Sequence, residues 1–228
     1  MQRLGLVGGL GPESTIDYYR RIIELAQKKG LPESPSIVID SLDVKRGLYL
    51  SGNDRAGLID YVLGSVQRLT AAGADFIAIA ANTPHLVFDE LAAQSKVPIV
   101  SIVETCAEEA ERRGLNKVLL LGTRFTMEAS FYPEVFRKRG IEVIAPEETD
   151  RIRVHDRYVN QLLNGVFTDE VRAEFAGLIQ RIRVEHGIDG VILGGTELTI
   201  LLVDSAIPGL QMLDTTALHV AAIVERIA

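Results

Sequence analysis

Two short polar segments stand 114 residues apart, and each follows an apolar run. The first reads Ala-Asn-Thr-Pro-His at 81–85, and the second reads Gly-Thr-Glu at 195–197. Asn and Thr side chains and backbone amides at such turns can hold an anion, although the same residue types also serve as helix caps. Because the two segments occupy equivalent places, we expect them to hold two ends of one small ligand.

Three further loops carry residues suited to ligand binding. Thr123 and Thr126 follow another apolar run and either hold a carboxylate or cap a helix. Gly9 lies in a glycine-rich turn that permits close backbone approach, but the G-x-G-x-x-G spacing of a dinucleotide loop is absent. Arg46 supplies a cation after a predicted strand, or else belongs to a solvated face.

Several common chemistries are not indicated. The histidines His85, His155, His186 and His219 are scattered and lack metal-site spacing, so no metal is expected. No G-x-S-x-G elbow is present. The single cysteine, Cys106, allows no internal disulfide or zinc cluster and is better explained as a buried apolar residue than as a nucleophile.

The elements that position these loops alternate along the chain. The predicted strands are Leu4–Val7, Ser36–Asp40, Phe76–Ala80, Ile99–Val103, Val118–Leu121, Glu142–Ile144, Val191–Leu193 and Gly209–Leu213. The predicted helices are Thr15–Lys29, Asp54–Ala72, Thr105–Arg113, Asp169–Glu185 and Thr216–Ile227. Apolar strands alternating with amphipathic helices predict an α/β fold with mainly parallel sheets flanked by helices.

An internal repeat organises the chain. The segments at 5–9 and 80–85 each have a match 114 residues later, and a third match joins 97–105 to 207–215. We therefore predict two pseudosymmetric α/β domains, residues 1–114 and 115–215, with a ligand cleft between them. The C-terminal helix, 216–228, is expected to return to the first domain.

Composition and net charge limit the classes of function that this chain can have. The 228 residues are 47% hydrophobic, and the net charge is -7 with a pI of about 5.2. Such a surface repels nucleic acid and anionic membrane on average. No apolar stretch approaches the roughly 18 to 20 residues of a membrane span. A cytoplasmic protein with a small-molecule partner, no nucleic acid and no membrane is expected.

These motifs together resemble the aspartate/glutamate racemase family. They are the opening Gly-Leu-Val-Gly-Gly-Leu-Gly-Pro-Glu-Ser-Thr, Asn-Thr-Pro-His at 82–85, Leu-Gly-Thr-Arg-Phe-Thr-Met at 121–127 and the late Gly-Gly-Thr-Glu-Leu, all in family order. The resemblance implies two pseudosymmetric domains, an interdomain active site and a homodimer. It also implies that neither pyridoxal phosphate nor a metal is needed as a cofactor.

The two catalytic positions of the family differ here. The resemblance implies a cysteine before each motif, and the two thiols exchange a proton on opposite faces of the substrate α-carbon. In this chain those positions are Ala81 and Gly195, so two-thiol racemisation is not carried over. The nearest titratable candidates in the matched loops are His85 and Glu197.

The substrate-binding residues of the family are largely retained. The matching positions are Gly9, Arg46, Asn82, Thr83, Thr123, Thr126 and Thr196. A lysine that some members use late in the second half is Asn164 here. The leading hypothesis is a racemase-family isomerase that binds a small amino or dicarboxylic acid. The alternatives are a non-catalytic amino-acid binding protein and a lyase or decarboxylase that uses the same carboxylate pocket.

Overall fold

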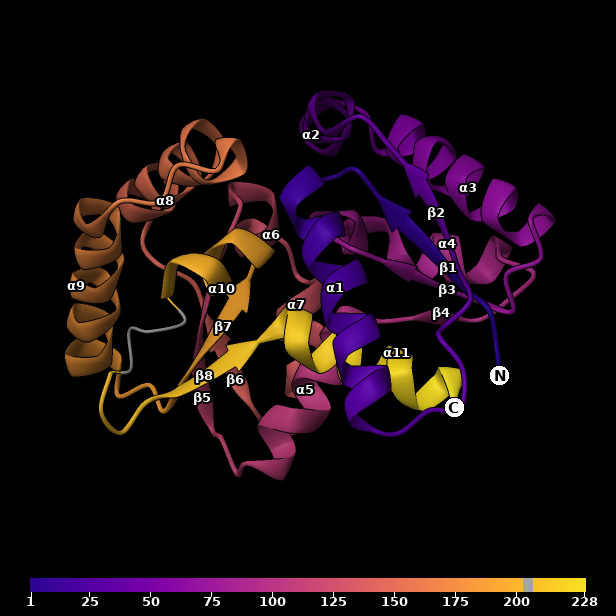
Figure 1. Ribbon diagram of the computed structural model, residues 1–228. Coiled ribbons are helices and arrows are strands. Elements are labelled where there is room, and N and C mark those ends of the chain that lie inside the picture. The colour runs from indigo at the N-terminus through magenta and orange to yellow at the C-terminus, as the bar shows by residue number, and fades with distance from the viewer. Residues whose placement is uncertain (203–206) are drawn as a thin grey trace. The chain divides into compact units, whose positions relative to one another are not determined.

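Two four-stranded sheets, both parallel throughout, organise the part of the chain that the structure describes. The computed structural model describes residues 1–202 and 207–228 (Figure 1). Packing divides the chain into two units, one of residues 1–102 with 216–228 and the other of residues 103–215. The boundary predicted at 114 therefore differs from the packing, which assigns 103–114 to the second unit.

The first unit contains four strands and the helices that cover them. Its elements are β1 (Leu4–Gly8), α1 (Pro12–Lys28), β2 (Ile37–Ser41), α2 (Val44–Asn53), α3 (Arg55–Ala71), β3 (Phe76–Ile79), η1 (Thr83–Val87), α4 (Phe88–Gln94), β4 (Ile99–Val100) and most of α11 (Thr215–Ile227). The sheet order is β2-β1-β3-β4. The pairs Val7↔Ile79 and Gly8↔Ser41 bring the carboxyl ends of three strands to one edge.

The second unit repeats this order. Its elements are α5 (Ile102–Arg112), β5 (Lys117–Gly122), α6 (Arg124–Glu128), α7 (Phe131–Arg137), β6 (Glu142–Ile144), α8 (Glu148–Asn160), η2 (Leu162–Asn164), α9 (Asp169–His186), β7 (Gly190–Gly194), α10 (Thr196–Leu202) and β8 (Gln211–Asp214). The sheet order is β6-β5-β7-β8. Gly122 pairs with Gly194, so the loops after β5 and β7 start side by side. The predicted fold class is confirmed.

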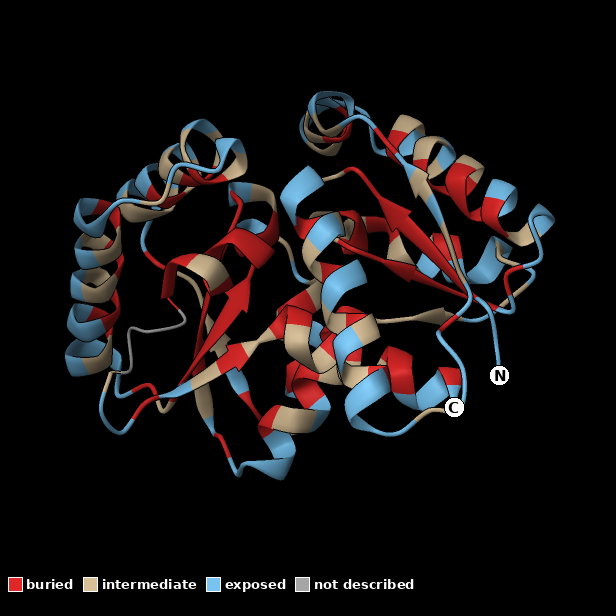
Figure 2. Ribbon diagram, viewed as in Figure 1, coloured by how far each residue is buried: buried red, intermediate tan, exposed pale blue. Residues whose placement is uncertain are grey.

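Burial explains why these segments form strands. The central strands β1, β3 and β7 are buried along their whole length, while the covering helices bury one face and expose the other (Figure 2). Strands covered on both faces need continuous apolar runs rather than alternation, which is what the sequence contains.

One predicted strand is partly helix. The run at 99–103 divides into β4 and the first turn of α5, which begins at Ile102, not at Thr105. The buried residues of α5 are Ile102, Val103, Cys106, Ala107 and Ala110. Their spacing follows a helical period that starts inside the apolar run.

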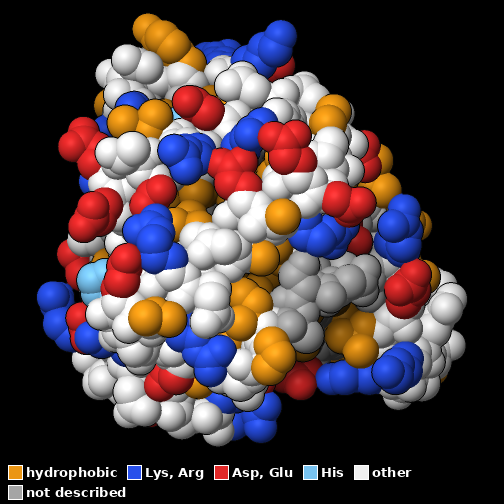
Figure 3. Space-filling model, turned by 90° about the vertical axis from the view of Figure 1, so that its left-hand side faces the viewer, with side chains coloured by type: hydrophobic (Ala, Val, Ile, Leu, Met, Phe, Trp, Pro, Cys, Tyr) orange, Lys and Arg blue, Asp and Glu red, His pale blue; other side chains and the backbone are white. Residues whose placement is uncertain are grey.

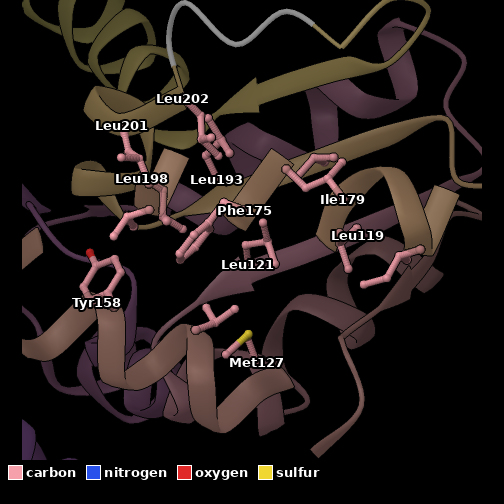
Figure 4. Packing of buried hydrophobic residues seen from close by; sticks show 14 of the residues in the cluster. Leu119, Leu121, Met127, Tyr158, Phe175, Ile179, Leu193, Leu198, Leu201 and Leu202 are labelled. Atoms are coloured by element: carbon pink, nitrogen blue, oxygen red, sulfur yellow. The ribbon is translucent and has the colours of Figure 1, made fainter. Parts of the chain in front are cut away.

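The second unit has a core of leucines and aromatic residues between its sheet and α8 to α10 (Figure 4). Leu121, Leu193 and Leu198 lie in this cluster with Phe175, and Tyr158 of α8 lies at one end of it. Burying a side chain of this size contributes about 1.5–3 kcal/mol. The cluster therefore fixes α8 against the loops that follow β5 and β7.

Ion pairs join α8 to α9 on the outside. Arg157 Nε lies 2.9 Å from Glu174 Oε2, and Arg181 Nη2 lies 2.5 Å from Asp150 Oδ2. On the face turned to the viewer in Figure 3, basic and acidic side chains alternate without a patch of one sign. Among the residues described, no helix is both long and apolar enough to cross a membrane.

A buried polar contact joins α11 to the rest of the first unit. The Tyr18 hydroxyl of α1 donates to His219 Nδ1 over 2.9 Å, and His219 Nε2 donates to the Val100 carbonyl over 3.0 Å. The two chain ends meet in the same unit, because the Gln2 amide donates to the Ile227 carbonyl over 3.1 Å. The C-terminal helix thereby closes a unit that begins at the N-terminus.

Tyr18→Phe is expected to lower the free energy of unfolding by about 1–3 kcal/mol, because His219 Nδ1 is left as a buried acceptor without its donor. The ring contact with His219 is retained in the variant. Urea denaturation measures the change. The control is Tyr19→Phe, whose parent side chain is half exposed, and equal losses in both variants would contradict the role given to the Tyr18 hydroxyl.

Candidate functional site

The turn after β1 depends on Gly9. Its φ is 77°, and a Cβ there would lie 2.1 Å from the Leu42 carbonyl oxygen. The Gly9 amide donates to Thr15 Oγ1 over 2.8 Å, and the buried Ser14 hydroxyl donates to the Ala80 carbonyl over the same distance. The glycine turn, the start of α1 and the end of β3 are thus held together at one edge of the sheet.

The loop after β3 contains the matched position Ala81, half-buried, followed by the buried Asn82 and the half-buried Thr83. Asn82 begins the 3₁₀ turn η1, and its carbonyl accepts from the His85 amide over 3.0 Å. The motif therefore forms a tight turn in which Ala81 contributes no titratable group.

His85 is occupied by backbone hydrogen bonds. Its Nδ1 donates to the Ala81 carbonyl over 3.2 Å, and its Nε2 accepts from the Ile102 amide over 3.3 Å. Burial lowers the pKa of His85 to about 4, and the ring stacks on Phe88. Because both ring nitrogens are used, this geometry gives His85 a role in supporting the turn instead of one in proton transfer.

Arg46 lies on α2, in the turn that Asp43 caps by accepting from the Arg46 amide over 2.7 Å. Its guanidinium lies 4.7 Å from the centre of the Tyr61 ring, and the side chain is exposed. Arg46 is therefore an exposed cation that rests on an aromatic face, and its part in ligand binding stays a prediction.

The loop after β5 places two hydroxyls in contact. Thr123 caps α6 by accepting from the Thr126 amide, and the two Oγ1 atoms lie 3.2 Å apart in a buried position. The Arg124 amide donates to His155 Nδ1 over 3.2 Å, so α8 supports the same loop. Burial lowers the pKa of His155.

The loop after β7 contains an acidic group with two hydroxyl donors. Glu197, only 2% exposed, accepts at Oε2 from the Thr196 hydroxyl over 2.9 Å and from the Tyr158 hydroxyl. Burial raises the pKa of Tyr158 well above its usual value, and the nearby Glu197 charge adds to this rise. Gly195, the second matched position, lies beside this cluster.

Sequence reasoning did not connect Tyr158 or His155 with the candidate loops. Both lie on α8, a helix that was not predicted, and their spacing of three residues places them on one helix face. The signal in the sequence is a buried pair, Val154 and Tyr158, within an otherwise charged segment. That pattern indicates a helix against a core, but not the loop that it contacts.

Two other positions lie outside these loops. Cys106 is fully buried in α5, and burial raises the pKa of its thiol. Asn164 is exposed and donates to the Asn160 carbonyl over 3.1 Å at the end of α8. Within the described ranges, no three His, Cys, Asp or Glu side chains are grouped as metal ligands.

Two parallel sheets of equivalent strand order, each with polar loops at its carboxyl edge, define a two-unit protein of the α/β class. The family model described as Asp/Glu/hydantoin racemase matches residues 7–223, and the chain belongs to this family. The resemblance identified from the motifs is thereby confirmed.

Individual proteins of known structure or activity are also similar to this chain. The chain is 34% identical to an aspartate racemase homologue from Pyrococcus horikoshii OT3, covering 100% of this chain and 99% of the other, with a TM-score of 0.83. It is 26% identical over 214 residues to the broad specificity amino-acid racemase RacX of Bacillus subtilis, covering 90% of each. An aspartate racemase from Picrophilus torridus, 17% identical with a TM-score of 0.78 and covering 100% and 94%, shares the fold.

Proposed function

We propose that the chain binds a small amino or dicarboxylic acid without exchanging its α-proton, because the two-thiol route of proton transfer is not available. The observation that carries this proposal is the pair of matched positions Ala81 and Gly195, where no thiol is present. Family membership supports an amino-acid ligand, and isomerase activity is the activity that its homologues suggest.

Ligand contacts are proposed for residues of three loops. In the first unit they are Asn82 and Thr83, at the carboxyl edge of its sheet. In the second unit they are Thr123, Thr126 and Thr196, which have buried side chains. Hydroxyl and amide groups fixed by a rigid sheet edge are suited to a carboxylate, because their orientation is set before the ligand arrives.

Proton abstraction lacks an evident base. An α-proton is weakly acidic, so its removal needs a basic group held against it. Both ring nitrogens of His85 are bonded to backbone groups. Glu197 is buried, and its Oε2 accepts hydrogen bonds from the Thr196 and Tyr158 hydroxyls, so this oxygen is already engaged within the protein. These contacts support binding more than racemisation.

The resemblance supports three further parts of the proposal. We propose a homodimer that is located in the cytoplasm and acts without a cofactor. Light scattering coupled to gel filtration tests the dimer, and a single monomer peak across a concentration series would contradict it.

The unchanged protein is expected to bind L- or D-aspartate or glutamate in calorimetry, and to leave the α-proton NMR signal intact in deuterated water. The variant Ala81→Cys/Gly195→Cys/Tyr158→Leu is expected to exchange the α-proton, since the smaller leucine side chain makes room for a thiol at position 195. Its matched control, Ala81→Ser/Gly195→Ser/Tyr158→Leu, has hydroxyls in the same places and is expected to stay silent.

Two results would contradict the proposal. Loss of the α-proton signal with the unchanged protein would show that a group other than a thiol acts as the base. If none of the four amino acids gives binding heat and the thiol variant also leaves the α-proton signal intact, then the proposal of an amino-acid ligand is wrong.

A decarboxylase is the second candidate, favoured because the Tyr158 hydroxyl, a proton donor, lies directly beside the matched position 195. Decarboxylation needs no base: the bond to the carboxylate breaks, carbon dioxide leaves and the electron pair stays on the α-carbon. That carbon then takes a proton from the phenol, which regains one from water. Release of carbon dioxide from substituted malonates, lost in Tyr158→Phe, would favour this candidate.

A further inference from the structure

A side chain on residue 195 would have no room in this structure. A Cβ built on Gly195 lies 2.4 Å from Tyr158 Oη, 2.5 Å from Cε2 and 2.7 Å from Cζ. Real Cβ atoms essentially never lie this close to a non-bonded atom, so either residue 195 stays glycine or the phenol moves. The tip of the Tyr158 ring fills the space that the second thiol needs.

The phenol is held in this place from two sides. Tyr158 is 5% exposed and packs in the cluster that contains Met127 and Leu198 (Figure 4). Its hydroxyl donates to the buried Glu197, which the Thr196 hydroxyl also contacts. Turning the ring aside would disrupt the packing and leave a buried carboxylate with one donor fewer, so the overlap is not relieved by a simple rotation.

We propose that Tyr158 is a specificity-determining residue, which takes the place of the side chain at residue 195 and so fixes what chemistry this loop can perform. The part of this proposal that concerns the chemistry of a bound ligand rests on the proposed function. The coupling between the two residues rests on packing alone, so the two parts can fail separately.

The chemical consequence concerns the protonation state of this position. A thiol at 195 is able to give and take a proton near neutral pH, whereas the phenol of Tyr158 stays protonated because burial and Glu197 raise its pKa. A ligand held by the loop after β7 therefore meets a neutral hydroxyl-bearing ring. No base is offered from this position.

A thermal double-mutant cycle tests the coupling. Gly195→Ala is expected to lower the Tm by ~5 °C or more, since overpacking in a domain of this size shifts the Tm by several degrees. In the Tyr158→Leu background the same change is expected to have little effect, because leucine lacks the three overlapping atoms. In Tyr158→Phe it is expected to remain harmful, since Cε2 and Cζ are retained.

The control glycine is Gly177, where a Cβ would meet nothing within 4 Å. Gly177→Ala is expected to leave the Tm unchanged or slightly raised in every background. Equal Tm losses for Gly195→Ala in the unchanged protein and in the Tyr158→Leu variant would overturn the proposal.

Thiol labelling tests whether the same position lies at the ligand site. The unchanged protein has one cysteine, the buried Cys106, which is expected to react slowly with iodoacetamide. In Gly195→Cys/Tyr158→Leu one further thiol is expected to react quickly, and aspartate or glutamate is expected to slow that reaction several-fold. With Gly195→Cys alone, labelling or folding is expected to fail.

The labelling results distinguish the role of Tyr158 from the proposed amino-acid ligand. Rapid labelling without protection by any of the amino acids would support the role of Tyr158 and overturn the proposed ligand. Rapid labelling in folded Gly195→Cys with Tyr158 unchanged would overturn the role of Tyr158, whatever the ligand.

Discussion

Acidification from about pH 6.5 to about pH 4.5 is expected to lower the free energy of unfolding by roughly 5 kcal/mol, before most carboxylates are protonated. The cause is a pair of buried neutral histidines in the first unit. Burial lowers the pKa of His85 to about 4 and that of His219 to about 3. The pKa of His219 is lowered further by the nearby His85.

The sign of this pH effect follows from the number of protons that the folded and unfolded states bind. Below about pH 6.5 an unfolded histidine binds a proton, whereas the folded His85 and His219 stay neutral until the pH reaches their own lower values. The unfolded chain therefore binds up to two more protons in this window, and stability falls as pH falls. Each histidine contributes about 1.4 kcal/mol per pH unit.

The measurement is urea denaturation across this pH range. His219→Gln and His85→Gln are each expected to reduce the slope of stability against pH by about one proton, because Gln keeps a donor and an acceptor but does not titrate. The control is His186→Gln, at an exposed position. An unchanged slope in both buried-site variants would show that these histidines do not limit acid stability.

Gly9→Ala is expected to lower the free energy of unfolding by about 3–5 kcal/mol. Part of this loss, about 1–2 kcal/mol, arises because an L side chain is disfavoured at φ 77°. The rest arises because the new Cβ would lie 2.1 Å from the Leu42 oxygen and 2.5 Å from the Leu42 nitrogen. Both are backbone atoms, which cannot turn away as a side chain can.

Gly30→Ala separates these two effects. Gly30 has a φ of 72°, and a Cβ there would meet nothing within 4 Å, so only the conformational part of the loss is expected. Urea denaturation of both variants, with calorimetry for aspartate or glutamate, gives stability and affinity together. If the two variants lose equal stability, then the close contact with Leu42 is not what requires glycine at position 9.

Much of the fold followed from the sequence because buried parallel strands are short continuous apolar runs, whereas amphipathic helices repeat their apolar residues every three to four positions. The run from Glu142 to Ile144 was predicted with its observed ends, and the internal repeat matches the shared strand order of the two sheets. The run at 99–103 was assigned wrongly, because an apolar segment too short to show its period can be strand or helix.

The candidate loops were found from their polar residues, but their neighbours were not. A sequence motif shows that Gly195 stands where a cysteine is expected, yet not which side chain fills the space that this leaves. Tyr158 lies 37 residues earlier on a helix whose charged sequence hid its buried face. Contacts of this kind depend on packing between distant segments, which no local pattern encodes.

The route of the chain has a consequence for the order of folding during synthesis. All of the second unit leaves the ribosome before the helix that completes the first unit. Until α11 emerges, Tyr18 has no His219 to bond and Gln2 has no partner at Ile227. The second unit, which is continuous in sequence, is therefore free to reach its native packing first. The first unit, whose synthesis begins earlier, is completed last.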